Sequence, residues 1–321
     1  MLLNAVERAG RTLSPVLQRS MLGEIGRRLC RWMSPLERLP RPFGRWSVEG
    51  RFLASAFIDP KGTHGIGLAH LQGLTFVVDP AEIVGRLLVY GFPFERFELG
   101  LFSSMLRPDD VVLDIGANFG LYSIVAEARL NHSGIVHAFE PNPDALSLLQ
   151  RNLGDPTRHE RVRIHPIAVG AETGMVKFLC SEDSAFSSVI DNGRNPLRKG
   201  LEVRQTTLDS FVAESALPGV DLVKIDVEGY EPEVLSGGES LLSRPDAPIL
   251  LIEIATPNLQ PRGLSQADVV NKLEMLGYDV RSAEPQLPRV RDLDSLGNRE
   301  NFLAVKPSRL DRLLGAAGLA H

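Results

Sequence analysis

The sequence has little cysteine and no long uncharged apolar run. Only two cysteines, Cys30 and Cys180, occur among its 321 residues, and neither stands in a Cys-x-x-Cys or Cys/His spacing. The sequence therefore predicts neither a disulfide framework nor a zinc site. No stretch of 18 or more uncharged apolar residues is present. This argues against a membrane-spanning helix, and we expect a cytoplasmic protein.

An overall positive charge is also missing. The net charge is −5, with a pI of about 5.9. No general basic field is available to hold a polyanionic backbone, so we expect no nucleic-acid partner. The remaining composition, 43% hydrophobic, 23% charged and 6% aromatic, is that of an ordinary globular protein and excludes a disordered or collagen-like chain.

The positive charge that does occur is concentrated at the N-terminus. Residues 1–48 contain nine arginines, no lysine and three glutamates, a sum of +6, which leaves −11 for the rest of the chain. Apolar side chains recur there every four residues from Leu13 to Met33, so the pattern predicts an amphipathic helix over 14–33. Such a helix could contact an anionic membrane surface or a partner, or it could pack on the acidic body of the same protein.

Beyond Asp109, short apolar runs alternate with helical patterns. Runs that are apolar throughout are typical of strands covered on both faces, and their alternation with helices predicts an α/β fold with a doubly wound, mostly parallel sheet. We expect an N-terminal helix, linker and hairpin region over 1–72, a main domain over 73–307 and a C-terminal tail over 308–321. The expected strands are 111–114, 135–140, 163–169, 222–226, 249–254, 278–280 and 302–305, and the expected helices include 122–129, 145–153, 232–242 and 265–276.

A glycine-rich turn follows the first of these strands. It reads DIGANFG, residues 114–120, and stands directly before a predicted helix. Glycines at the carboxyl end of a parallel strand allow the backbone to close tightly on a ligand. Twenty residues later the second strand ends in Glu140, which could accept hydrogen bonds from both hydroxyls of a ribose. The pair predicts a site for an adenosine-containing ligand.

The identity of that ligand follows from Asp114. A dinucleotide site requires G-x-G-x-x-G with a pyrophosphate over the helix N-terminus, whereas here the glycines are Gly116 and Gly120, with an acid at the strand tip. An acidic strand tip disfavours a pyrophosphate and favours an ammonium group. The pattern therefore favours S-adenosylmethionine over NAD or ATP, and no P-loop motif is present.

The most charged segment on any predicted buried strand is KIDVEGYE, residues 224–231, at the end of the fourth strand. Lys224 and Asp226 point to one face of a strand, so a buried lysine could be matched by its own neighbour. We expect Asp226 at the cofactor and substrate edge, with Lys224 or Glu228 orienting or deprotonating an acceptor. The alternative is a structural ion pair, with Glu228 serving the next helix.

The order of these motifs resembles the FkbM family of S-adenosylmethionine-dependent methyltransferases. The resemblance covers roughly residues 73–306 and rests on DIGANFG, FEPNP, HPIAVG, TTLDSF, DLVKIDVEGYEPEVLSGG and LLIEI, in that order. It implies a class I methyltransferase fold of the Rossmann-like type, a seven-stranded sheet of order 3-2-1-4-5-7-6 with the last strand antiparallel. It also implies O-methylation of hydroxyl groups on sugars, polyketides or related metabolites.

The resemblance also implies a set of cofactor-binding residues. Asp114, Gly116, Asn118 and Gly120 would surround the methionyl part, Glu140 would hold the ribose, and Ala168 would lie near the adenine. Glu95 resembles an acidic position that precedes the first strand, although the segment from Gly91 is one residue longer than in the family. The complete cofactor-binding prediction comprises Glu95, Asp114, Gly116, Ala117, Asn118, Gly120, Glu140, Pro141, Ala168 and Asp226.

The sequence thus predicts an enzyme that methylates a hydroxyl of a sugar, glycan or secondary metabolite, with Asp226, Lys224 and Glu228 as catalytic candidates. Carboxylates at strand ends could hold Mg²⁺, but nothing in the sequence demands it, and we expect no metal. Two alternatives remain open: a protein- or nucleic-acid-directed enzyme on the same fold, and a non-catalytic scaffold that acts through the N-terminal helix. The acceptor and the oligomeric state cannot be read from the sequence.

Overall fold

The computed structural model describes residues 67–71, 73–89, 94–131, 133–181, 183–191, 197–290 and 300–319. The chain divides into two compact units, Met1–Phe94 and Glu95–His321. The predicted amphipathic helix over 14–33 lies outside the described residues. In the first unit, β1 (Gly67–Leu71) pairs antiparallel with β2 (Leu74–Val78), and helix α5 (Ile83–Val89) follows. A hairpin is therefore present, but β2 lies beyond residue 72, where the N-terminal extension was expected to end.

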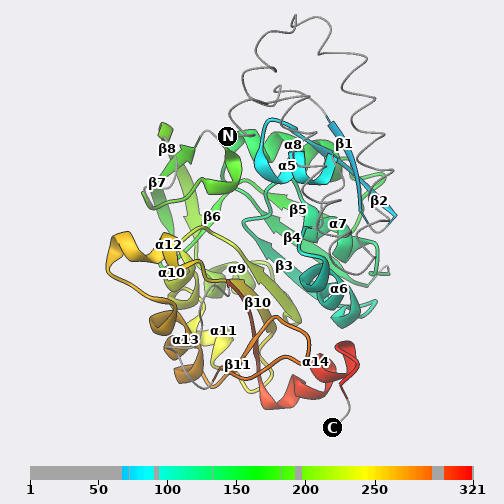
Figure 1. Ribbon diagram of the computed structural model, residues 1–321, viewed down its shortest axis with the longest axis vertical. Helices are drawn as coiled ribbons and strands as arrows, with labels where there is room; N and C mark the ends of the chain where they lie inside the picture. Colours follow the sequence, from blue (N-terminus) through cyan, green and yellow to red (C-terminus); the bar gives the residue numbers. More distant parts are fainter. Residues whose placement is uncertain are drawn as a thin grey trace, which may run out of the picture. The chain divides into compact units, whose positions relative to one another are not determined.

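The second unit is built on a seven-stranded sheet with the order β11-β12-β10-β9-β3-β4-β5 (Figure 1). The pairs β3–β4, β4–β5, β3–β9 and β9–β10 are parallel, and β12 runs antiparallel to both of its neighbours. This confirms the predicted α/β class and the predicted strand order. The strands are β3 (Val111–Ile115), β4 (Ile135–Phe139), β5 (Val162–His165), β9 (Leu222–Ile225), β10 (Ile249–Glu253), β11 (Asp279–Ser282) and β12 (Asn301–Val305).

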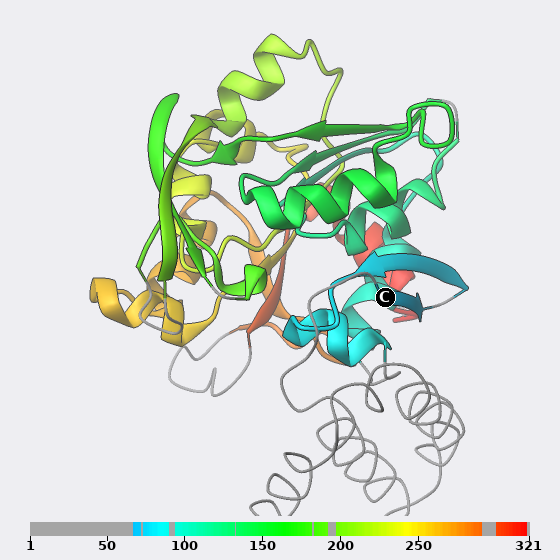
Figure 2. The ribbon, with the colours of Figure 1, turned by 90° about the horizontal axis from the view of Figure 1, so that it is seen from above.

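Helices cover both faces of this sheet. In Figures 1 and 2, α7 (Leu121–Glu127) and α8 (Pro143–Leu153) lie on one side, and α9 (Leu208–Glu214) lies on the other. The main apolar core lies on the α9 side, where alternate strand residues such as Leu113, Val223 and Leu250 meet helix residues such as Phe211. The other helices of this unit are α6 (Arg96–Met105), α10 (Glu231–Ser236), α11 (Glu239–Leu242), α12 (Thr256–Leu259), α13 (Gln266–Met275) and α14 (Leu310–Ala316).

The sheet register brings charged residues together on the opposite face. Asp114 of β3 is directly beside Lys224 of β9, and Lys224 is beside Leu251 of β10. Because side chains two residues apart share a face of a strand, Glu253 and Asp226 continue this row toward the carboxyl edge. Pairing alone therefore places one lysine and three carboxylates in neighbouring positions.

The segment 163–169 is not the single strand that the sequence predicts. β5 ends at His165, and Ala168–Val169 form β6, which belongs to a separate three-stranded sheet of order β6-β8-β7. Pro166, between the two, has no backbone N–H to continue the ladder. The other strands of the small sheet are β7 (Gly174–Ser181) and β8 (Leu197–Thr206), which form an antiparallel pair.

The predicted helix 232–242 is also divided, into α10 and α11. A Cβ on Gly237 would lie 2.0 Å from the carbonyl oxygen of Gly170, so the chain passes too close to its neighbour for a side chain at this point. The helix ends there, and α11 starts after Gly238. Apolar periodicity continued through both glycines, which is why the sequence suggested one element.

Residues 308–321, expected to be a tail, include α14, whose Arg312 forms an ion pair with buried Asp110 and donates to the carbonyl of Met105 at 2.9 Å. The domain boundaries at 72 and 307 stay a prediction.

Among the described helices, none combines the length and apolar character that crossing a bilayer requires.

Phe302 tests the packing of the sheet, because its side chain is fully buried in β12 between β10 and β11. Phe302→Ala should lower the free energy of unfolding by about 3–5 kcal/mol, the usual cost of removing a buried phenylalanine. Met275→Ala is the matched control, because Met275 is 88% exposed, and it should change stability by less than about 0.5 kcal/mol. Urea unfolding followed by circular dichroism measures both, and equal losses would contradict this packing.

Candidate functional site

The glycine turn joins β3 to α7 in a conformation that side chains would block. Gly116 and Gly120 have φ angles of 81° and 96°, in the left-handed region. A Cβ on Gly116 would lie 1.8 Å from the carbonyl oxygen of Asp226, so only glycine allows β3 and β9 to leave the sheet this close together. The backbone N–H groups of Gly116 and Ala117 both donate to the carbonyl of Phe139, at 3.0 and 2.9 Å. The turn is thus tied to the end of β4.

Asp114 lies beneath this turn and is 1% exposed. Its Oδ2 accepts a hydrogen bond of 2.6 Å from the hydroxyl of Ser123 on α7. Burial raises the pKa of Asp114 to about 6, against the opposing effects of the Ser123 hydrogen bond and the Lys224 charge. A nearby cation therefore stabilises the ionised form of this buried carboxylate.

Glu140 directly follows β4 and is held by backbone donors from two loops. Its Oε2 accepts from the N–H of Asn118 at 2.8 Å, and its Oε1 accepts from the N–H of Asn142 at 2.7 Å. The side chain is 6% exposed, and burial raises its pKa to about 7 even though both hydrogen bonds lower it. Each carboxylate oxygen has two lone pairs, so the group can still accept hydroxyl donors.

Glu95 precedes α6 and contacts α7. The hydroxyl of Tyr122 donates to its Oε2 at 2.7 Å, and burial raises the pKa of Glu95 while the charge of Lys224 lowers it. Glu95 itself has a φ of 40°, unusual for a residue with a side chain. The structure therefore brings this predicted residue into the same charged group as Asp114 and Lys224.

Lys224 is the central cation of the site. It is 1% exposed, and its Nζ lies 3.3 Å from Oδ2 of Asp226 and 5.2 Å from the ring centre of Tyr122. Burial disfavours the ammonium, but the surrounding carboxylates outweigh this effect and raise the pKa of Lys224 above its usual value. These carboxylates are Asp226, Glu95, Glu253 and Asp114, in order of decreasing effect.

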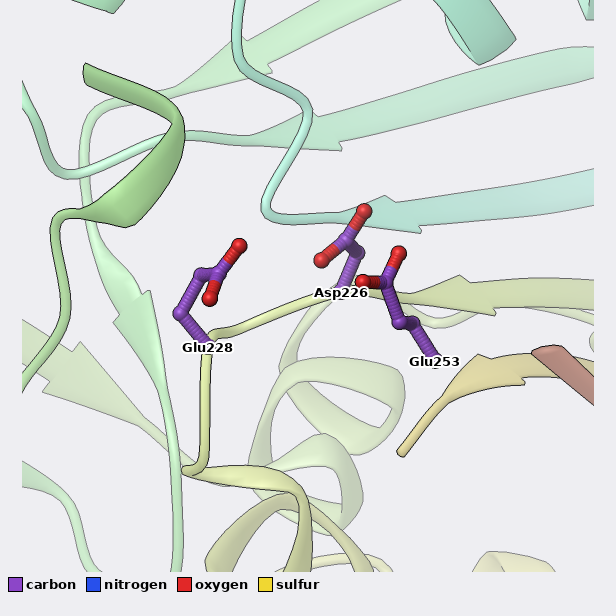
Figure 3. A group of neighbouring side chains, drawn as sticks. All are labelled: Asp226, Glu228 and Glu253. Carbon is purple, nitrogen blue, oxygen red and sulfur yellow. The ribbon is translucent and has the colours of Figure 1, made fainter. Parts of the chain in front are cut away.

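A group of three carboxylates, Asp226, Glu228 and Glu253, converges at the ends of β9 and β10 (Figure 3). One oxygen of each lies within 4.8 Å of the others. The negative charge of Asp226, followed by burial, raises the pKa of Glu253 well above its usual value. Oxygen ligands at this spacing could hold a divalent cation, but Lys224 already brings a positive charge to Asp226. The absence of a metal stays a prediction.

Glu228 and the turn around it are held from two sides. Glu228 has a φ of 53°, and its Oε2 accepts from Nδ2 of Asn258 at 2.6 Å. Buried Glu231 accepts from the N–H groups of Gly229 and Val227, at 3.1 and 3.4 Å. The turn that carries two of the three carboxylates is therefore fixed by side chains on following helices.

The remaining predicted residues lie around this edge. Pro141 follows Glu140 and is partly exposed, and Asn118 follows Ala117 in the glycine turn with a φ of 50°. Ala168 is in β6, in the small sheet, where it is buried with Phe178 and Val203. Hydrogen bonds link Glu140 with Asn118, and Lys224 with Asp226. Ala168 belongs to the small sheet and not to the main sheet that carries these residues.

Ser123 was not among the predicted site residues. From the sequence, Glu253 was a candidate only as a metal ligand at a strand end, and Tyr122 only as an aromatic partner of the sulfonium. The contacts of Ser123 with Asp114 and of Tyr122 with Glu95 could not be predicted, because a helix sequence does not reveal which face meets a strand tip. His165, by contrast, lies at the end of β5, stacked on Phe139 and 2.9 Å from Nδ1 of His137.

These features suit the cofactor that the sequence predicts. Gly116 has no room for a side chain, and raised pKa values occur at the buried carboxyl groups of Asp114 and Glu140 at the strand ends and at that of Glu95 before α6. Excess buried negative charge favours a ligand that carries an amine and a sulfonium. It disfavours a ligand that carries phosphates.

Comparison with known proteins gives a consistent result. The family model described as Methyltransferase FkbM domain matches residues 114–280. The 2-O-methyltransferase NoeI of Sinorhizobium fredii is 28% identical over 160 residues, which is 44% of this chain and 63% of that protein. The hexuronic acid methyltransferase AglP of Haloferax volcanii is 28% identical over 209 residues, 64% of this chain and 81% of that protein.

A third relative, the 31-O-demethyl-FK506 methyltransferase FkbM of Streptomyces tacrolimicus, is 31% identical over 164 residues, 42% of this chain and 61% of that protein. The chain thus spans less than two thirds of the length of two of these three relatives. Among solved structures, methyltransferase FkbM from Methylobacillus flagellatus aligns with a TM-score of 0.41 at 14% identity, over 87% of this chain and 58% of that one.

The matched region begins at Asp114, the first residue of the glycine turn, and ends at Val280 in β11. It includes Lys224 with Asp114, Asp226 and Glu253, and four of the seven strands in full. The protein belongs to the FkbM family of S-adenosylmethionine-dependent methyltransferases.

Proposed function

We propose that this protein transfers a methyl group from S-adenosylmethionine to a hydroxyl group of a sugar, a glycan or a secondary metabolite. The observation that carries the proposal is the set of carboxylates around buried Lys224, next to the glycine turn at the carboxyl edge of the sheet. The names of the relatives support the acceptor class: a 2-O-methyltransferase, a hexuronic acid methyltransferase and a 31-O-demethyl-FK506 methyltransferase.

The cofactor-binding roles follow from charge and hydrogen-bonding capacity. Asp114, Glu95 and the backbone from Gly116 to Gly120 would hold the methionyl part, because these carboxylates favour an amine and a sulfonium. Glu140 would accept the ribose hydroxyls with the lone pairs that its two backbone donors leave free. Pro141 and Ala168 would lie beside the ribose and the adenine. Bound S-adenosylmethionine supplies an electrophilic methyl group on a sulfonium.

The catalytic roles divide between a fixed cation and proton acceptors. Lys224 remains charged because its pKa is raised, so it orients Asp226 and does not take up a proton. Asp226 and Glu228 would align the acceptor hydroxyl, and Glu253 would receive its proton. The negative charge of Asp226 raises the pKa of Glu253 well above the usual value, so the ionised form of Glu253 is a stronger base than an ordinary carboxylate. Alignment itself accounts for much of the rate of such an in-line displacement.

Two alternatives remain for the experiment to exclude. A protein- or nucleic-acid-directed enzyme would use the same cofactor with a macromolecular acceptor, and a scaffold would bind without turnover. The net charge of −5 fits a nucleic-acid acceptor poorly. The cytoplasmic location and a membrane or partner contact through residues 14–33 remain part of this proposal. Residues 14–33 lie outside the described residues, so the structure does not test this contact.

The first prediction concerns turnover. Purified full-length protein, incubated with S-adenosylmethionine and a panel of methyl glycosides that includes methyl β-D-glucuronide, should form S-adenosylhomocysteine and an O-methylated sugar, detected by mass spectrometry. Glu253→Gln should lower kcat by about 10²-fold, the lower range for loss of a general base, and should leave cofactor affinity almost unchanged. Glu274→Gln, at an exposed position of α13, is the control. Equal rates in the two variants would contradict the role of Glu253.

The second prediction concerns pH. A carboxylate with a raised pKa loses its charge as the pH falls through that pKa, and the pKa of Glu140 is about 7. Between pH 8 and pH 6.5, where Asp114 with its pKa of about 6 is still mostly ionised, the Kd for S-adenosylmethionine should therefore rise about fourfold as the pH is lowered. Calorimetric titration measures this change.

The matching variants separate Glu140 from general effects of pH. Glu140→Gln should bind more weakly at pH 8 and show an almost constant Kd over the same range. Glu214→Gln, exposed at the end of α9, should behave as the wild type. A slope that persists in Glu140→Gln would show that another group controls the binding.

A further inference from the structure

The segment between β7 and β8 touches the loops that carry the proposed site. Its described part, residues 183–191, begins with the short 3₁₀ helix η3 (Ser184–Phe186) and includes the neighbouring pair Ser187 and Ser188. From the sequence this polar segment could be a substrate lid or an ordinary surface loop. Both serines are buried, at 9% and 2% exposure, which an ordinary surface loop does not require.

Ser188 contacts the loop after β9. Its hydroxyl donates to the carbonyl of Val227 at 3.0 Å, and its backbone exchanges two hydrogen bonds with Leu179 of β7, at 2.7 and 3.1 Å. Val227 lies between Asp226 and Glu228, the two carboxylates of that turn (Figure 3). The small sheet therefore holds the peptide that joins two proposed catalytic groups.

The same peptide segment is held from its other side. The N–H of Val227 donates to Glu231 at 3.4 Å, so Ser188 and Glu231 together engage both polar groups of this residue. The turn needs such support, because Glu228 and Gly229 adopt left-handed φ angles of 53° and 100°. Without the Ser188 hydroxyl, the carbonyl of Val227 loses its partner and the carboxylates beside it lose a fixed position.

Ser187 contacts a different loop. Its hydroxyl oxygen accepts from Nδ2 of Asn142 at 3.1 Å and from the N–H of Ser181 at 3.0 Å. Asn142 is 2% exposed, and its own N–H donates to Glu140 at 2.7 Å. Ser187 thus connects the small sheet to the ribose side of the proposed cofactor site. Its neighbour Ser188 connects the same sheet to the turn with the proposed catalytic carboxylates.

We propose that Ser187 and Ser188 are positioning residues with separate tasks: Ser187 supports cofactor binding through Asn142 and Glu140, and Ser188 supports turnover through the Asp226–Glu228 turn. The inference rests on the proposed function, which assigns cofactor binding to the loop with Glu140 and catalysis to the turn with Asp226 and Glu228. It is a statement about alignment, since neither serine is assigned a contact with a reacting atom. The Ser187 hydroxyl then affects the Kd for S-adenosylmethionine, and the adjacent Ser188 hydroxyl affects kcat.

The test compares Ser187→Ala and Ser188→Ala in the full-length protein. Loss of one hydrogen bond of ordinary strength corresponds to about a fivefold effect. Ser187→Ala should raise the Kd for S-adenosylmethionine about fivefold with kcat at saturating cofactor nearly unchanged. Ser188→Ala should lower kcat with methyl β-D-glucuronide about fivefold or more and leave that Kd within about twofold.

Ser181→Ala is the matched control. Ser181 is also buried, at the end of β7, and its hydroxyl has no hydrogen-bond partner among the described residues, so its removal reports only general packing. Hydrogen exchange adds a readout that needs no acceptor. The peptide spanning 222–230 should exchange faster in Ser188→Ala but not in Ser187→Ala or Ser181→Ala.

The outcomes are distinguishable from failure of the proposed function. If the wild type does not bind S-adenosylmethionine, the proposed function fails and the serines are not the cause. If the wild type binds the cofactor but does not methylate the glucuronide, the Kd values and hydrogen exchange decide the inference. Equal changes of Kd and exchange in both serine variants, or changes no larger than those of Ser181→Ala, would overturn it.

Discussion

The structure of the site depends on one buried ammonium group. Lys224 stands in the middle of the sheet beside Asp114, with Asp226 3.3 Å away and Glu95 and Glu253 close enough to raise its pKa. A lone lysine in this position would be strongly destabilising, and so would the carboxylates without it. Parallel register brings Asp114, Lys224, Asp226 and Glu253 together from three strands, and Glu95 joins them from the start of α6. The fold and the charge cluster are therefore consequences of the same strand pairing.

This arrangement leaves the site with more carboxylates than cations. One cation faces several carboxylates, and the pKa values of Glu95, Asp114 and Glu253 are raised in spite of it. A site with several carboxylates around one cation favours a positively charged ligand, and the raised pKa values mean that these carboxylates bind protons more tightly than free carboxylates do. Both properties are useful to an enzyme that binds a sulfonium and methylates a hydroxyl. The glycine at position 116 adds the space that such a ligand requires.

The sequence predicted the sheet better than the site. Runs such as VVLD and ILLIEI indicate covered strands because their first three or four residues are all apolar. The resemblance to the FkbM family implied the sheet order that the structure confirms. Predictions were wrong where one local residue overrides a regular pattern, as Pro166 does after β5 and Gly237 does after α10. Lys224, Asp226 and Glu228 could be found because they are adjacent in sequence. Ser123, Asn258 and Ser188 could not, since each meets the site through tertiary contacts alone.

The most direct test of this account is the pH dependence of stability in Lys224→Met. The substitution keeps the volume and removes the charge, so the carboxylates around it lose their compensation. At pH 8, well above the pKa of about 6 of Asp114, the free energy of unfolding should fall by about 3–5 kcal/mol relative to the wild type. The loss should shrink toward pH 5, because carboxylates with raised pKa values take up protons in the folded state. A loss of the same size at every pH would mean that Lys224 contributes packing only, and would contradict the account.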